Sequence, residues 1–172
     1  MSYKQYIFCL ETTKQADTDW LYIRKVIDYL NKDNQSFDRY KPLYMAGKGN
    51  YNNKSFVRQL KEAINMFSGE SIVIYCMDLD DYHTNSETKK FVDNVERYCE
   101  ENNYRFVYFS RDIEEVFWGK RISQEDKKKY AAKFSREGNI TEYLLNKISK
   151  ETKTVGTSNL WKMINGSNEQ DI

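Results

Sequence analysis

The chain has 172 residues, of which 40% are hydrophobic and 15% are aromatic. This length fits one domain with a full core, and the composition excludes a disordered chain. The 27 Lys and Arg side chains nearly balance the 26 Asp and Glu side chains, for a net charge of +1. The overall charge therefore favours neither nucleic acid nor a membrane as a partner. Only local clusters of charge can indicate one.

The apolar runs and the cysteines indicate where in the cell the protein is expected to lie. No apolar run reaches 18 residues, which predicts no membrane span, and the N-terminal residues lack the long apolar stretch of a signal peptide. The three cysteines, Cys9, Cys76 and Cys99, form no C-x-x-C pair. We expect free, buried thiols, a cytoplasmic location and no structural zinc.

Four predicted strands alternate with helices along the first two thirds of the chain. The strands are 5–10, 41–46, 71–77 and 105–110; the first helix runs to residue 30, and the following helices are about 53–67, 86–102 and 112–118. Asp17 or Thr18 can cap the first helix, and Pro42 stands at the beginning of the second strand. This alternation predicts an α/β fold with a mostly parallel sheet of about four strands and helices on both faces.

Three further helices are predicted after this core, at 123–134, 140–149 and 158–164, before a polar tail. We found no internal repeat and no low-complexity linker. The expected organisation is a single domain over 1–172, with an α/β core at 5–118, a helical extension at 119–165 and a flexible tail at 166–172.

Acidic residues stand at the ends of two predicted strands. Asp78 and Asp80 follow the apolar run SIVIYCM, and Glu11 follows YIFCL. Side chains two apart on a strand share a face, so both aspartates are expected to point the same way. If the strands are neighbours, all three carboxylates meet at one edge, where they suit Mg²⁺ or Mn²⁺. The alternative is a helix-capping or loop pair of aspartates.

A glycine turn, Gly47-Lys48-Gly49, follows the second strand. Glycines let the backbone approach a ligand, and Lys48 adds a positive charge for a phosphate. The turn lacks the P-loop pattern, so ATP binding is not indicated. The alternative is an ordinary tight turn with a solvated lysine.

Two glutamates, Glu114 and Glu115, follow the fourth strand. Either is a candidate metal ligand, or both are simply acids favoured in the first turn of a helix. The sole histidine, His83, lies in a loop without a nucleophile motif, which argues against Ser-His or Cys-His hydrolysis but leaves a phosphate contact open.

Basic residues cluster in the extension, and aromatic residues lie between them. Lys120 and Arg121 begin the cluster, and Lys127, Lys128 and Lys129 continue it. This pattern suits a nucleic-acid backbone, although a lysine run is also typical of a solvated helix face.

Taken together, these motifs resemble the Toprim (topoisomerase–primase) fold. Its pattern is a glutamate ending the first strand, a glycine turn after the second and Asp-x-Asp ending the third, matched here by Glu11, Gly47 and the segment 78–80. The likeness covers about residues 5–118 and is nearest to RloB-like proteins and the Toprim nuclease part of OLD-family proteins, whose acidic motif after the fourth strand SRDIEEVFW resembles. Asp81 stands near where topoisomerases and primases place a glycine, so the nuclease branch is favoured.

The resemblance implies an Mg²⁺-dependent (or Mn²⁺-dependent) nuclease on DNA or RNA, with a role in defence against phage or mobile elements. Asp78 and Asp80 would hold the metal, Glu11 would ligate it or act as general acid/base, and Asp80→Asn would abolish cleavage. It also implies partners: nucleic acid, and an ATPase or a second copy.

Two rival hypotheses remain. One is a non-catalytic Toprim-like binding module that works through a protein partner. The other is a receiver-like domain that accepts a phosphoryl group, which the position of the acid pair after the third strand rather than the first disfavours.

Overall fold

The computed structural model describes residues 3–33 and 37–165; the predicted tail at 166–172 lies outside this range. Its centre is a four-stranded, all-parallel sheet in the order β2-β1-β3-β4. The strands are β1 (Lys4–Leu10), β2 (Arg39–Tyr44), β3 (Glu70–Asp78) and β4 (Arg105–Phe109). The predicted α/β class with a parallel sheet is confirmed, and the fold is Rossmann-like.

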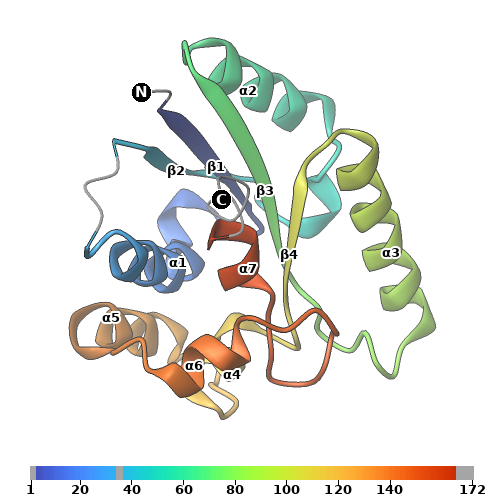
Figure 1. The fold of residues 1–172 in the computed structure, drawn as a ribbon. Helices are drawn as coiled ribbons and strands as arrows, with labels where there is room; N and C mark the ends of the chain where they lie inside the picture. The colour runs from blue at the N-terminus through green and yellow to red at the C-terminus, as the bar shows by residue number, and fades with distance from the viewer. Residues whose placement is uncertain (1–2, 34–36, 166–172) are drawn as a thin grey trace.

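Helices cover both faces of the sheet (Figure 1). One face carries α2 (Lys54–Asn65) and α3 (Ser86–Glu101). The other carries α1 (Thr18–Leu30), α4 (Ile113–Trp118) and the extension, whose helices are α5 (Lys127–Glu137), α6 (Glu142–Lys147) and α7 (Leu160–Asn165). Short 3₁₀ turns lie at η1 (Lys14–Ala16) and η2 (Lys48–Asn50).

Strand alternation divides the core into two layers. On β3, Ile74 and Cys76 face α1 and the extension, whereas Val73, Tyr75 and Met77 face α2 and α3. Both layers are buried, because a central parallel strand is covered on each side. The first layer includes α5, α6 and α7, so the extension shares the core of the α/β part.

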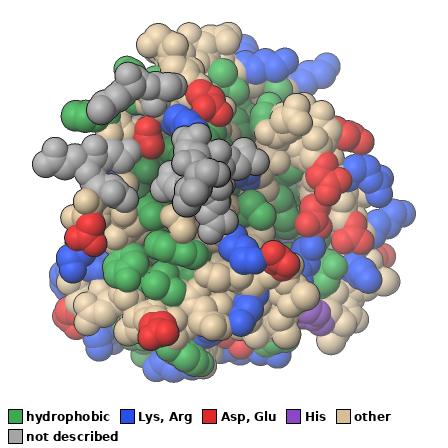
Figure 2. Space-filling model, viewed as in Figure 1, with side chains coloured by type: hydrophobic (Ala, Val, Ile, Leu, Met, Phe, Trp, Pro, Cys, Tyr) green, Lys and Arg blue, Asp and Glu red, His purple; other side chains and the backbone are tan. Residues whose placement is uncertain are grey.

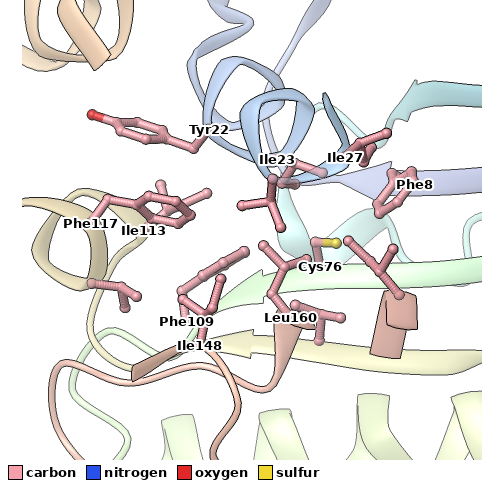
Figure 3. Close-up of a cluster of buried hydrophobic side chains, with 14 of the residues drawn as sticks. Phe8, Tyr22, Ile23, Ile27, Cys76, Phe109, Ile113, Phe117, Ile148 and Leu160 are labelled. Atoms are coloured by element: carbon pink, nitrogen blue, oxygen red, sulfur yellow. The ribbon is translucent and has the colours of Figure 1, made fainter. Parts of the chain in front are cut away.

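Figure 3 shows how this first layer is filled. Ile23 and Ile27 of α1 point toward Phe8 of β1 and Cys76 of β3, and Leu160 lies beside them. Tyr22 extends toward Phe117, and their ring centroids are 5.0 Å apart. As predicted, all three cysteines are free and buried.

Several predicted boundaries are wrong in detail. Pro42 lies inside β2, opposite Phe8, rather than at its beginning. It is tolerated because β2 is an edge strand, whose outer side needs no ladder donor. The helix predicted from residue 123 begins only at Lys127. Asp17 is the residue before α1, but its side chain makes no capping hydrogen bond.

None of the helices among the described residues is long and apolar enough to cross a membrane. On the face seen in Figure 2, acidic and basic side chains alternate over α3, and neither sign dominates. Positive and negative side chains therefore do not form two separate patches on this face.

Candidate functional site

The carboxyl ends of β1 and β3 are adjacent, because these strands pair in parallel over six residues from Lys4 opposite Glu70 to Cys9 opposite Tyr75. This adjacency is the condition on which the predicted acidic site depends. Glu11 follows β1, and its Oε1 accepts a hydrogen bond of 2.6 Å from the backbone N–H of Asp78, the last residue of β3. The structure therefore brings Glu11 and Asp78 together.

Asp78 continues the face of Ile74 and Cys76, so its side chain lies on the side of α1 and the extension. Its Oδ1 accepts a hydrogen bond of 3.0 Å from the backbone N–H of Ile113, at the start of α4. One acid thus connects the end of β3 to the first turn of the helix that follows β4.

A cavity of about 250 Å³ opens beside these two acids; we call it the acid pocket. Other residues that line it include Thr12, Asp19, Glu114, Lys127 and Lys128. Asp19 comes from the first turn of α1 and Glu114 from the first turn of α4. The extension, through Lys127 and Lys128, therefore supplies one wall of a pocket whose other walls belong to the α/β core.

The carboxyl groups in the acid pocket are short of positive charge. Burial raises the pKa of Glu11 to about 8, although the hydrogen bond from Asp78 N–H opposes this shift. Burial and the charge of Glu114 raise the pKa of Asp19 to about 7. Burial and the charge of Glu11 raise the pKa of Asp78 well above its usual range. A cation that binds beside these acids would therefore compete with protons.

Lys127 lines this pocket and forms ion pairs with Glu114 and Asp112. Its Nζ lies 2.9 Å from Glu114 Oε2 and 3.5 Å from Asp112 Oδ2. Burial alone would lower the pKa of Lys127, but its contact with Glu114 raises it above the usual value. Glu114 is fully buried, and its Oε1 has no hydrogen-bond partner among the described residues.

Asp80 lies elsewhere, so the expectation that Asp78 and Asp80 point the same way is wrong. β3 ends at Asp78, and Asp80 adopts a left-handed backbone conformation with φ +48°. Alternation applies only while the chain stays extended. The Asp80 carboxylate is about half exposed and pairs with Lys48 Nζ from the turn after β2.

Asp80 lines a second, wider cavity of about 480 Å³, which we call the outer pocket. His83, Arg111, Glu115 and Arg121 also line it. Glu115 pairs with Arg111 at 3.0 Å, and His83 Nε2 lies 3.5 Å from Ser110 Oγ. The two candidate glutamates therefore separate: Glu114 lines the acid pocket and Glu115 the outer pocket.

The remaining predicted residues lie around these pockets or apart from them. Gly47, with φ +121°, begins the turn that presents Lys48. At Gly49 a Cβ would meet open space, so the packing there does not require a glycine. Lys120 lies against Tyr130, 4.9 Å from its ring centroid, and lines neither pocket.

Asp19 was not among the site residues predicted from the sequence. The available signal was its position in the first turn of the helix that follows β1, which faces the same sheet edge as Glu11. Lys127 was noted only as one of several basic residues, since the sequence does not show which lysine of the run 127–129 turns inward.

Among residues 3–33 and 37–165, no group of three or more His, Cys, Asp or Glu side chains is arranged to hold a metal ion. Comparisons with protein-family models, curated proteins and solved structures gave no match.

Proposed function

We propose that this protein is a divalent-metal-dependent phosphodiesterase that acts on nucleic acid, with the Toprim type of acidic site. One observation carries the proposal: Glu11 and Asp78, from the ends of neighbouring strands, meet beside a cavity. Neither carboxylate has a basic side chain within ion-pair distance among the described residues. A buried pair of acids without a counter-charge favours a cation from solution.

The donors fit a hard divalent ion. Mg²⁺ keeps several waters and uses only one or two protein carboxylates, so a pair is sufficient without a cage of three. Glu11 and Asp78 would hold the ion, with Asp19 beside them. When bound, such an ion would polarise a phosphate and activate water for attack on a phosphodiester.

The side chains of the pocket can move a proton as well. A carboxyl group with a pKa of about 8 exchanges its proton near neutral pH, which suits a general acid or base. In the metal-free chain Glu11 is therefore our choice for the proton-transfer residue, and on metal binding it would give up this proton to become a ligand.

Cations at the rims suit a polyanionic substrate. Lys128 lines the acid pocket, Arg111 and Arg121 line the outer pocket, and Lys48 lies in the turn that follows β2. Because the net charge is only +1, binding would depend on these few contacts and weaken with salt in proportion to their number.

The test compares Asp78→Asn with Asp28→Asn, a control on the exposed face of α1. We expect Asp78→Asn to weaken Mn²⁺ binding by at least tenfold and to abolish Mn²⁺-dependent cleavage of labelled DNA and RNA oligonucleotides. Asn keeps an acceptor for Ile113 N–H, so the melting temperature should not fall. Electron paramagnetic resonance measures free Mn²⁺, and wild-type protein that binds none would refute the proposal.

Asp80→Asn separates the two pockets. Asp80 pairs with Lys48 and lines the outer pocket, so we expect this change to reduce Mn²⁺ affinity less than Asp78→Asn does. The opposite order of effects would show that Asp80, not Asp78, is the main ligand.

A non-catalytic binding module is the second candidate. The observation in its favour is that no group of three or more potential ligands is arranged around a metal position in the described part of the chain. Oligonucleotide binding without Mn²⁺ binding, and without cleavage, would favour this module.

A further inference from the structure

The carboxylates at this sheet edge fall into two classes according to their partners. Asp80 pairs with Lys48, Glu115 with Arg111, and both Asp112 and Glu114 with Lys127. Glu11 and Asp78 meet through the hydrogen bond from Asp78 N–H to Glu11 Oε1, Asp19 lies beside them in the acid pocket, and none of the three has such a partner among the described residues. Only this second class therefore needs a cation that the protein does not supply.

Lys127 stands where a second cation would be expected. It lies between two acids, 2.9 Å from Glu114 and 3.5 Å from Asp112, and lines the same pocket as Glu11 and Asp78. Its three N–H donors and single charge serve the same oxygens that a metal ion would use. Glu114 is 99% buried in its side chain and has an unpartnered Oε1 in this pocket, so these oxygens depend on a cation.

The fold holds Lys127 in this place. It is the first residue of α5, and α5 packs on α1 through Phe134, whose ring lies 5.3 Å from that of Tyr22. The side chain of Lys127 is 22% exposed, so most of it is packed beside these acids.

We propose that the Lys127 ammonium occupies the position of a second divalent cation, so that the acid pocket takes one metal ion rather than two. This inference rests on the proposed function, because it presupposes an ion at Glu11 and Asp78. The neighbouring acids Asp112 and Glu114 then share one positive charge from within the chain and are not metal ligands.

The experiment counts Mn²⁺ ions per folded chain at saturation, by electron paramagnetic resonance and by isothermal titration calorimetry. We expect one for the wild type, one for Lys127→Arg and two for Lys127→Met. Lys128→Met is the matched control, since Lys128 lines the same pocket without an ion pair among the described residues, and it should stay at one. Two ions in the wild type, or one in Lys127→Met, would overturn the inference.

Glu114→Gln gives a second reading that does not require Lys127→Met to fold. If Lys127 serves Glu114, this isosteric change should leave one Mn²⁺ per chain with affinity within about threefold of the wild type. A loss of tenfold or more would make Glu114 a ligand and reject the inference. A wild type that binds no Mn²⁺ rejects the proposed function itself, which keeps the two failures distinct.

Discussion

Two aspartates two positions apart have different environments in this protein. Asp78 is the last extended residue of β3 and turns toward α1 and α4, where it is partly buried. Asp80 follows after a change to a left-handed backbone and pairs with Lys48 at the surface. The break in alternation thus decides which carboxylate is desolvated, and a desolvated carboxylate favours a bound cation more strongly than an exposed one does.

The raised pKa of Glu11 predicts a pH dependence of stability in metal-free buffer. Its pKa is about 8 in the folded chain against 4.5 in the unfolded chain, so the folded state holds the extra proton between these values. Stability therefore falls as the pH rises from 4.5 to 8. Glu11→Gln should flatten this slope and raise the free energy of unfolding at pH 8 by on the order of 2 kcal/mol.

Urea denaturation in EDTA at pH 5 and pH 8 measures this difference. Glu101→Gln, on the exposed end of α3, serves as the control and should keep the wild-type slope. When Mn²⁺ replaces EDTA, the free energy of unfolding of the wild type at pH 8 should rise. Equal slopes for Glu11→Gln and wild type would mean that Glu11 titrates normally.

At the scale of elements, the outer edge of β4 is covered by the segment that leads into α7. Asn159 accepts a hydrogen bond of 3.0 Å from Tyr108 N–H and donates one of 2.9 Å to the carbonyl of Phe106. Ser110 N–H donates to the carbonyl of Thr157 at 2.9 Å. One side chain and one extended segment thus hydrogen-bond to backbone groups at an edge that could otherwise pair with another chain.

Asn159→Ala should destabilise the protein by about 2 to 3 kcal/mol, because it leaves a buried N–H and a buried C=O without partners. Asn94→Ala, on the exposed face of α3, should change stability by less than about 0.5 kcal/mol. Urea denaturation compares the two variants. Faster hydrogen exchange at Tyr108 would locate the effect, and equal stability of both variants would contradict the edge-cover role.

At the scale of the whole molecule, the extension and the α/β part share one core. Phe134 of α5 contacts Phe117 and Tyr22, with ring centroids 5.1 Å and 5.3 Å apart, and Tyr22 belongs to α1. The acid pocket lies between the same two parts. The geometry of the pocket therefore depends on the packing of the extension.

Phe134→Ala should destabilise the protein by about 3 to 5 kcal/mol, since it opens a cavity between α1, α4 and α5. The unfolding transition should remain single, with circular dichroism and tryptophan fluorescence changing together. Tyr143→Ala, at a site that is 76% exposed, is the control. Two separate transitions in the wild type would show that the extension folds on its own.

The sequence by itself determined the α/β class, the four strands and the position of Glu11 and Asp78 at strand ends. Apolar periodicity and chain alternation are local properties, and parallel strands place their carboxyl ends at one edge. Only the tertiary structure decided that Asp80 leaves this group, that Asp19 joins it and that Lys127 pairs with Glu114. These choices depend on one backbone dihedral angle and on the packing of α5 against α1, which are set by contacts between distant segments and leave no periodic pattern in the sequence.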